Sequence, residues 1–394
     1  MGETFGEALR RFRTRAGLSQ PALARRVYVA QSTISRIETG RQTEIDEDLA
    51  ERLDSALEAD GTLLARRAAF SAPDHGHPAL GESVVASTTD YDRGRPVDAD
   101  YVDALRATIH HLVALDSAHG GGDTSRLAVR TFNSAHRKLT AGYYLPKVER
   151  DFEAVTAELG EVAGWLCYDA ERQTEARQLN LEALALSRLA GDRPMELFVL
   201  SNQAMMSLHT GRPQEALRIA DSVLEHNHLP PRLGVLFRIR RARALAALGD
   251  RTSALVEYAR VRSLFAEGVS RHDPSWTWWI TDRELRWHEG MGLTSLGDWS
   301  AAIPRFVAAV DCPRFPRGLY VSRTYLLEAL VRAEAWPDAE TVALDTLPMV
   351  GEVGSIRAER VLGGIAARSH HGGSPMSASL SDIMSEISNR IRAA

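Results

Sequence analysis

The fold of the first seventy residues is decided by two adjacent segments, LSQPALARRV at residues 18–27 and QSTISRIETG at residues 31–40. Ser19 is a good N-cap for a helix over the first segment, because its side chain can accept a hydrogen bond from a free backbone N–H group. Ile34 and Ile37 are spaced i, i+3, which places both on one inward face of a helix over the second segment. We therefore predict two short helices with a break between them.

The segments on both sides of this pair predict further helices. Apolar residues recur at helical spacing before Gly17, which ends a first helix: Phe5, Leu9, Phe12 and Ala16. After the pair, the acidic run 46–48 favours the start of a fourth helix, since negative charge is stabilising at a helix N-terminus. One face of that helix carries Leu49, Leu53 and Leu57. Residues 1–70 are thus expected to form a small helical domain.

Charge is distributed unevenly over these predicted helices. Residues 1–41 contain eight arginines and three glutamates, a net charge of +5. Residues 42–60 contain eight acidic residues and one arginine, a net charge of −7. A surface that meets DNA phosphates must be positive. The first three helices are therefore expected to face DNA, and the fourth is expected to point away from it.

The outer face of the predicted third helix is polar and carries a single charge. It presents Gln31, Ser32, Thr33, Ser35 and Arg36. Glutamine can form paired hydrogen bonds with adenine and arginine with guanine, while serine and threonine hydroxyls suit base edges or phosphates. These side chains meet the requirements for reading the major groove. The alternative is a solvated face used for protein contacts.

Together the two segments resemble the helix-turn-helix of the Cro/cI-like (XRE) repressor family, over about residues 5–63. The resemblance implies an all-α, five-helix lambda-repressor-like domain whose third helix contacts bases and phosphates through the residues named above. It gives Gln20 a role in buttressing that helix and touching phosphate, and it matches Arg10 and Arg41 to phosphate-contacting positions. Glu38 matches an acid that pairs with the first helix, and Arg10 is the expected partner.

Two residues depart from the family pattern at the break between the second and third helices. Tyr28 stands where the family has glycine, and a bulky residue at positive φ costs roughly 1 kcal/mol. Ala30 stands where the family has a serine or threonine N-cap, a loss of roughly 0.5–2 kcal/mol. The start of the third helix is therefore expected to be less rigid than in the family.

The remainder of the chain divides into a linker and a long helical region. Residues 71–100 contain few large apolar residues and several prolines and glycines, which indicates a flexible linker. The expected domains are therefore a DNA-binding domain at residues 1–70 and a helical domain at residues 101–394.

A short sequence motif recurs along the helical region. In this repeat phrase, a small residue is followed five positions later by alanine. It is clear at Gly211–Ala216, Gly249–Ala254 and Gly297–Ala302, and weaker around Ala176 and Ala339. Successive alanines are 40, 38, 48 and 37 residues apart, a little more than the length of a tetratricopeptide (TPR) unit. We therefore predict a TPR-like helical solenoid, with each alanine placed where two antiparallel helices approach closely.

The long 48-residue step contains an insertion with a cluster of tryptophans. Five of the seven tryptophans fall within one 24-residue window. Aromatic walls favour small molecules and peptides, so Trp276, Trp279 and Trp287 are candidate ligand-binding residues, although tryptophan also commonly fills gaps between helices. Asn202 and Arg240 are further candidates if the first helix of each pair lines the inside of the solenoid.

The C-terminal stretch predicts one last amphipathic helix. Its apolar residues recur at helical spacing: Leu380, Ile383, Met384, Ile387 and Ile391. Since it ends the stack, this helix either caps the solenoid or pairs with another subunit.

Composition argues against several other classes of protein. Hydrophobic residues make up 44% and charged residues 25%, the mix of a soluble globular protein, and no window approaches 18 consecutive apolar residues. The N-terminus lacks the pattern of a signal peptide, so a cytoplasmic location is expected. Two cysteines, adjacent histidine pairs that cannot chelate together and the lack of a phosphate-binding loop lead us to expect no metal, no cofactor and no enzymatic activity.

The layout of a helix-turn-helix followed by a TPR-like array resembles the peptide-pheromone receptors of Gram-positive bacteria and, more closely, actinomycete XRE regulators. In the receptors, which act in quorum sensing, the array binds a signal peptide in its concave groove. We therefore expect a transcriptional regulator with double-stranded DNA and a peptide or small-molecule effector as partners. One helix-turn-helix domain buries too little surface for tight specific binding, so a homodimer on an inverted repeat is expected. The alternative is a protein-interaction scaffold that antagonises another regulator without binding DNA.

Overall fold

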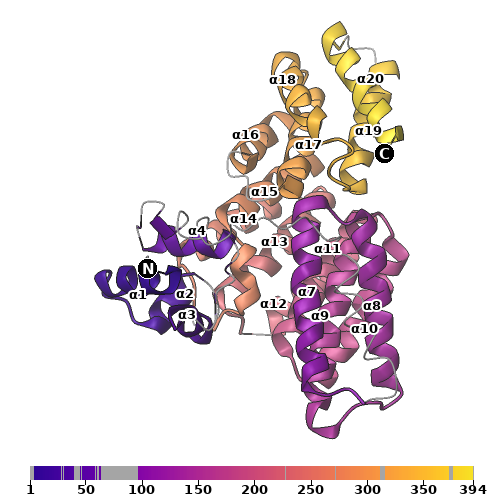
Figure 1. Cartoon of the computed structure of the whole chain (residues 1–394). Helices are drawn as coiled ribbons and strands as arrows, with labels where there is room; N and C mark the ends of the chain where they lie inside the picture. The colour runs from indigo at the N-terminus through magenta and orange to yellow at the C-terminus, as the bar shows by residue number, and fades with distance from the viewer. Residues whose placement is uncertain are drawn as a thin grey trace. The chain divides into compact units, whose positions relative to one another are not determined.

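The structure is a computed structural model of the 394-residue chain, and it describes residues 4–27, 29, 31–39, 45, 47–57, 59, 62–63, 96–226, 228–270, 272–310, 316–371 and 376–393. In these residues the regular elements are helices, and strand-like pairing is limited to an isolated bridge between Val97 and Tyr144. The predicted all-α fold is therefore confirmed (Figure 1). Contacts divide the chain into two units, Met1–Leu80 with Val269–Trp279 and Gly81–Gly268 with Ile280–Ala394. We call residues 4–63 the head and the second unit the array.

The head contains α1 (Phe5–Arg15), α2 (Gln20–Arg26), α3 (Gln31–Glu38) and α4 (Glu47–Ala56). Thr4 caps α1 in a capping box with Glu7, and Ser19 caps α2 by accepting a hydrogen bond from the Ala22 N–H. Each cap satisfies a backbone donor that the first helical turn leaves free. Ala16, which the sequence placed on the apolar stripe of the first helix, instead lies just past the end of α1 and is exposed.

The apolar faces of these helices meet in one core. Ile34 and Ile37 of α3 are buried, as their spacing predicts, in the same cluster as Leu9 of α1 and Leu53 of α4. Gly6 permits the close approach of α1 to α3, because a Cβ at Gly6 would lie only 2.2 Å from the carbonyl oxygen of Ile37. A larger residue there would force the two backbones apart.

Some expectations for the head fall outside the described residues. These are the strain at Tyr28, the missing cap at Ala30 and a fifth helix after Leu63. The residues of the linker up to position 95 also lie outside them, while Asp98 already caps the first helix of the array by accepting a hydrogen bond from the Tyr101 N–H. The predicted domain boundaries stay predictions.

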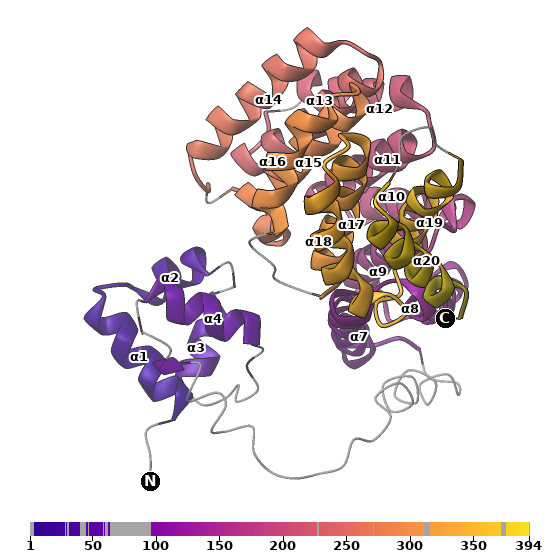
Figure 2. The ribbon, with the colours of Figure 1, turned by 90° about the horizontal axis from the view of Figure 1, so that it is seen from above.

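The array is built from helix pairs, α7 (Ala99–His119) with α8 (Gly122–Thr140), α9 (Glu149–Asp169) with α10 (Gln173–Leu189), α11 (Arg193–His209) with α12 (Pro213–His226), α13 (Pro231–Ala247) with α14 (Arg251–Ala266), α15 (Asp282–Ser295) with α16 (Trp299–Val310), α17 (Pro316–Arg332) with α18 (Trp336–Thr346), and α19 (Ile356–His371) with α20 (Ala378–Ala393). The first helix of one pair contacts the first helix of the next, from α9 to α11, α13 and α15. This stacking gives the expected solenoid (Figure 2).

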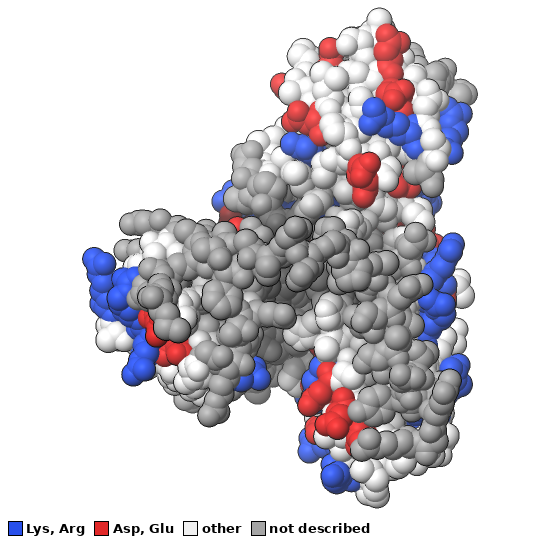
Figure 3. Space-filling view, viewed as in Figure 1, with Lys and Arg blue, Asp and Glu red and all other residues white. Residues whose placement is uncertain are grey.

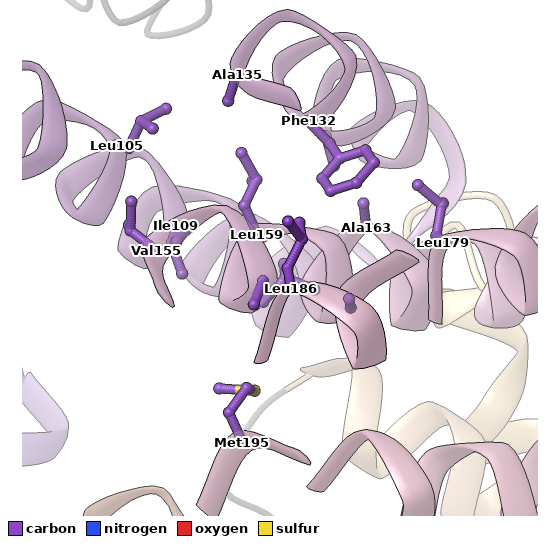
Figure 4. Close-up of a cluster of buried hydrophobic side chains, with 14 of the residues drawn as sticks. Leu105, Ile109, Phe132, Ala135, Val155, Leu159, Ala163, Leu179, Leu186 and Met195 are labelled. Carbon is purple, nitrogen blue, oxygen red and sulfur yellow. The ribbon is translucent and has the colours of Figure 1, made fainter. Parts of the chain in front are cut away.

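An apolar core holds together the N-terminal helices of the array, from α7 to α11 (Figure 4). Buried side chains from α7 to α11 contribute to it: Leu105, Ile109, Phe132, Ala135, Val155, Leu159, Ala163, Leu179, Leu186 and Met195. Gly160 of α9 leaves room for the ring of Phe132, since a Cβ there would lie 2.8 Å from a ring carbon. The close fit of α8 on α9 therefore depends on a missing side chain.

The recurring alanines occupy one structural position. Each is the fourth residue of the second helix in its pair and has no exposed surface: Ala176, Ala216, Ala254, Ala302 and Ala339. A larger side chain in a fully packed site of this kind forces strain of about 1–3 kcal/mol. All five predicted alanines are therefore buried at the same position of their helix pairs.

The residue five positions before each of these alanines has positive φ. Gly211, Gly249 and Gly297 hold this position in the clear repeats, with φ between 72° and 82°. Glu171 and Glu334 hold it in the two weaker repeats, with φ of 56° and 58°. The repeat phrase is therefore weak there in sequence although the turn has the same backbone geometry.

The insertion between α14 and α15 contains the 3-10 helix η2 (Ser275–Trp279), and two other short 3-10 helices are η1 (Pro146–Val148) and η3 (Leu347–Met349). The predicted C-terminal helix is α20, which buries Leu380, Met384 and Ile387 and packs on α18 and α19. None of the described helices is long and apolar enough to cross a membrane.

The N-terminal end of the array contacts its C-terminal part, because α7 packs on α17. Two backbone hydrogen bonds join the turn between α7 and α8 to the segment before α19, from Gly122 N–H to the Gly354 carbonyl at 3.1 Å and from Gly354 N–H to the His119 carbonyl at 2.7 Å. Beside them lies a group of polar side chains that we call the clasp. Asp116, Asp169, Ser355 and Arg357 are buried, and Arg317 is half-buried.

Candidate nucleic-acid interface

The outward surface of α3 carries the side chains that the sequence predicts to read DNA. Gln31 and Arg36 are exposed, and Thr33 and Ser35 are half-buried. The side chain of Ser32 and all of Arg41 lie outside the described residues. The described candidates on α3 are thus fully or partly accessible to solvent.

Exposed arginine side chains are also found on α1 and α2. Arg10, Arg11, Arg15, Arg25 and Arg26 are all exposed. Figure 3 shows blue side chains gathered over the part of the head that contains α1. The cationic character predicted for the first three helices is therefore present at the surface and is available to phosphates.

A hydrogen-bond network connects α1, α2 and α3 behind this surface. Arg13 makes a paired contact with Glu38, with Nε–Oε1 at 2.5 Å and Nη2–Oε2 at 2.9 Å. The Gln20 amide donates to Glu38 Oε2 at 2.8 Å, and its own oxygen accepts from Gln31 Nε2 at 2.9 Å. The network therefore runs from Arg13 through Glu38 and Gln20 to Gln31.

Glu38 is the centre of this network. Burial raises the pKa of its carboxyl, but the hydrogen bonds from Arg13 and Gln20 and the positive charges of Arg13 and Arg10 outweigh burial and leave the pKa below its usual value. The expected partner Arg10 is wrong, because Arg13 makes the contact and Arg10 acts only through its charge. Glu38 is thus a carboxylate that holds Gln20 in one orientation.

The orientation of Gln20 decides that of Gln31. Because the Gln20 oxygen accepts one Gln31 N–H, the Gln31 amide keeps a second N–H and its oxygen for other partners. One donor and one acceptor side by side match the N7 and N6 edge of adenine. The role of Gln20 as a buttress for the third helix, implied by the family resemblance, agrees with this geometry.

The candidate ligand residues fall into two groups, of which one lies in the array. Asn202 is buried on α11 and donates to Glu161 Oε1 at 2.6 Å, and the adjacent Ser201 accepts from Arg240 Nε at 3.0 Å. Trp287 is half-buried on α15 next to His288. Trp276 and Trp279 lie apart from these in sequence, half-buried in η2. The structure therefore brings Asn202, Arg240 and Trp287 into one neighbourhood of the array.

Sequence reasoning missed several buried or half-buried polar residues of the array. They are Glu161 beside Asn202, Arg243 one turn after Arg240, His288 after Trp287, and the clasp residues. The i, i+3 spacing of Arg240 and Arg243 was a usable signal, because it puts both on one face of a helix. In a chain with 47 basic residues that signal is weak.

Glu161 is the buried carboxyl with the clearest pH effect. Burial raises its pKa to about 8, and the negative charge of Glu158 adds to the shift. Its Oε1 accepts the hydrogen bond from Asn202. Glu161 is therefore largely protonated at neutral pH in the folded chain.

Replacing Glu161 by glutamine is expected to remove a pH-dependent loss of stability. The unfolded chain ionises Glu161 above about pH 4.5, whereas the folded chain keeps it protonated up to about pH 8. The stability that protonated Glu161 contributes is therefore fully present below pH 4.5. Between pH 4.5 and pH 8 the free energy of unfolding falls by about 1.4 kcal/mol for each pH unit. In thermal melts from pH 5 to 8.5, the melting temperature of E161Q should rise relative to that of the parent as the pH rises. Equal pH dependence in E161Q, in the parent and in the exposed control E225Q would contradict this.

Comparisons with known proteins give a family model and similarity to solved structures. Residues 4–66 match the family model described as "Helix-turn-helix domain". A search of curated protein sequences finds no match to the chain. The crystal structure of Bacillus thuringiensis PlcR in complex with the peptide PapR7 and DNA is similar to 86% of this chain and 99% of its own, at 14% identity and a TM-score of 0.36. Residues 4–66 are therefore a helix-turn-helix domain, which is followed by a helical repeat array.

Proposed function

We propose that this chain is a sequence-specific DNA-binding transcriptional regulator whose array senses a peptide or small-molecule ligand. The observation that supports DNA binding best is the exposed amide of Gln31, held by Gln20 and Glu38 on a cationic surface. A solvated face used only for protein contacts has no need of a fixed donor and acceptor pair. In this proposal residues 1–70 bind DNA, residues 71–100 are a linker, and residues 101–394 sense the ligand and dimerise.

Dimerisation is part of the proposal because of the size of the reading surface. A single domain of this kind buries about 600–1,000 Å² of protein surface on DNA, which is less than tight specific binding needs. Two heads on an inverted repeat, one or more helical turns apart, double that surface. The array is the element that would hold the two copies together.

The test is operator binding by the full chain after genome-wide mapping of bound DNA. Gln31→Ala is expected to relax base preference by about 1–3 kcal/mol at one position of each half-site. Arg10→Ala is expected to weaken binding to all sequences alike and to reduce the salt slope by about 1. Gel shifts between 50 and 200 mM salt separate the two effects.

The matched control is Arg106→Ala, which removes an exposed arginine from α7 of the array. It should bind the operator as the parent does. Binding by Q31A and R10A that equals the parent at every salt concentration would overturn the assignment of Gln31 and Arg10 to the DNA interface. A parent chain that binds no DNA would favour the protein-interaction scaffold. Dimerisation is checked by the mass of the chain in solution and on the operator.

A further inference from the structure

One cluster in the array consists of hydrogen-bond donors from two neighbouring helices, α13 and α15 (Figures 1 and 2). Arg240 of α13 is 2% exposed and His288 of α15 is 4% exposed. Arg243 and Trp287 beside them are half-buried. All four side chains belong to the first helices of their pairs, which stack along the array.

The four side chains are in contact with one another. Arg240 Nη1 lies 3.5 Å from His288 Nε2, and the His288 ring centroid is 4.9 Å from that of Trp287. The guanidinium carbon of Arg243 is 5.8 Å from the Trp287 ring centroid. The cluster is therefore continuous across the two helices.

Three buried atoms of this cluster have no hydrogen-bond partner among the described residues: Arg243 Nε, Trp287 Nε1 and His288 Nδ1. The first two are donors by chemistry. His288 is neutral because burial and the charges of Arg240 and Arg243 lower its pKa well below 6.5. Since Arg240 donates to Nε2, the proton of the neutral ring is on Nδ1, so the third atom is a donor as well.

The positive charge of the cluster is also uncompensated at short range. In the part of the chain that the structure describes, neither Arg240 nor Arg243 forms an ion pair with a carboxylate, whereas the buried Arg357 pairs with Asp169 at 3.0 Å. Glu284 acts on Arg240 through its charge, but its contact is with Arg283 at 2.9 Å. A buried charge without a partner is costly to the fold, as is a buried donor without an acceptor.

We propose that Arg240, Arg243, Trp287 and His288 bind one anionic group, a carboxylate or a phosphate, of the ligand that the array senses. Donors without acceptors and two arginines without carboxylates are complementary to an acceptor that carries negative charge. The inference rests on the proposed sensing function, because it names the chemistry of the ligand. The group can come from the carboxylate end of a peptide or from a phosphorylated small molecule.

The experiment measures binding of simple anions to the full-length chain by calorimetry and thermal melts. The probes are inorganic phosphate, N-acetylglycine as a carboxylate, and N-acetylglycinamide as its neutral match, each at constant ionic strength. Phosphate or N-acetylglycine should bind and raise the melting temperature of the parent by a few degrees, while the amide should not. The probe with the larger effect identifies the source of the group.

Variants decide whether the cluster is the site. Arg243→Met should lower affinity for the binding anion at least tenfold, and Trp287→Phe, which removes one N–H and keeps an aromatic ring, should lower it several-fold. Arg286→Met is the control, because it removes an exposed arginine from the same helix α15, where it pairs with Asp282. R286M should bind the anion as the parent does.

A second readout covers the case in which R243M folds poorly. Arg240→Met should melt at or above the temperature of the unliganded parent, because it removes a buried charge that has no carboxylate. The inference is overturned if no anion stabilises the parent beyond sodium chloride, or if R243M and W287F respond as R286M does. Operator binding separates the two proposals: a parent that binds the anion without any change in operator affinity keeps the site and loses the sensing function.

Discussion

Replacing Asp169 by asparagine is expected to lower the free energy of unfolding of the array by about 3–5 kcal/mol, because it leaves a buried arginine without its counter-charge. Asp169 has no exposed surface, and its Oδ1 accepts from Arg357 Nη2 at 3.0 Å, Arg357 Nε at 3.2 Å and Ser355 Oγ at 3.1 Å. Arg357 is 4% exposed. Asparagine keeps the shape of the side chain and removes only the charge.

The loss should be concentrated where the N-terminal helices of the array meet the segment before α19. Asp169 and Arg357 are 188 residues apart in sequence, and Arg317 contacts the second clasp carboxylate, Asp116, at 3.2 Å. Hydrogen exchange of the Gly122 and Gly354 amides, whose bonds join the turn between α7 and α8 to the segment before α19, should therefore speed up in D169N. Denaturant unfolding gives the global change.

A double-mutant cycle separates the clasp from general damage. D169N and R357M should each destabilise the array strongly, and the double variant should recover part of the loss, because no charge is left unpaired. The control is Asp345→Asn, which breaks the exposed Arg323–Asp345 pair and should cost at most about 1 kcal/mol. A D169N variant no less stable than D345N would show that the clasp contributes little.

Lowering the pH should destabilise the clasp, as D169N does. Burial raises the pKa of Asp169, but the charges of Arg357 and Arg317 and the hydrogen bonds from Arg357 and Ser355 outweigh burial, so the pKa lies below its usual value. The stability that this carboxylate contributes is therefore present above about pH 4 and is lost as pH falls through the lowered pKa. Asp169 thus acts opposite in sign to Glu161 over the acidic range.

Local patterns in the sequence predicted the parts of the fold that depend on local spacing. The i, i+3 isoleucines predicted the buried face of α3, and the repeated alanines predicted where helices of the array meet. Ala176 and Ala339 gave only a weak signal because Glu171 and Glu334 take the positive φ that glycine takes elsewhere. The backbone geometry of those turns therefore does not require glycine.

The parts that sequence could not predict depend on choices between equivalent residues or on distant contacts. Arg10 and Arg13 lie on the same face of α1 as Gly6, which touches α3, so spacing alone allows either to reach Glu38. The way in which α1 crosses α3 places Arg13, and not Arg10, in contact with Glu38. The clasp joins residues nearly 190 positions apart, and among so many arginines nothing local distinguishes Arg357.

Replacing Glu38 by alanine is expected to change both the stability of the head and its reading of DNA. Arg13 and Gln20 lose their shared acceptor, and hydrogen bonds to a charged group contribute about 1.5–3 kcal/mol. Gln20 is then free to rotate, so Gln31 loses the partner that orients it. Operator affinity should fall roughly tenfold, an effect in the range of one paired amide–base contact.

A compensated variant separates positioning from folding. Replacing Arg13 by methionine and Glu38 by leucine together removes both charges and fills their space, so most of the stability should return. The orientation of Gln20 does not return, because leucine accepts no hydrogen bond, and the affinity for the operator should stay low. Glu38→Gln keeps one acceptor for Gln20 and should bind better than the compensated variant. If the compensated variant binds as the parent does, Glu38 serves the fold alone and Gln31 reads DNA without its help.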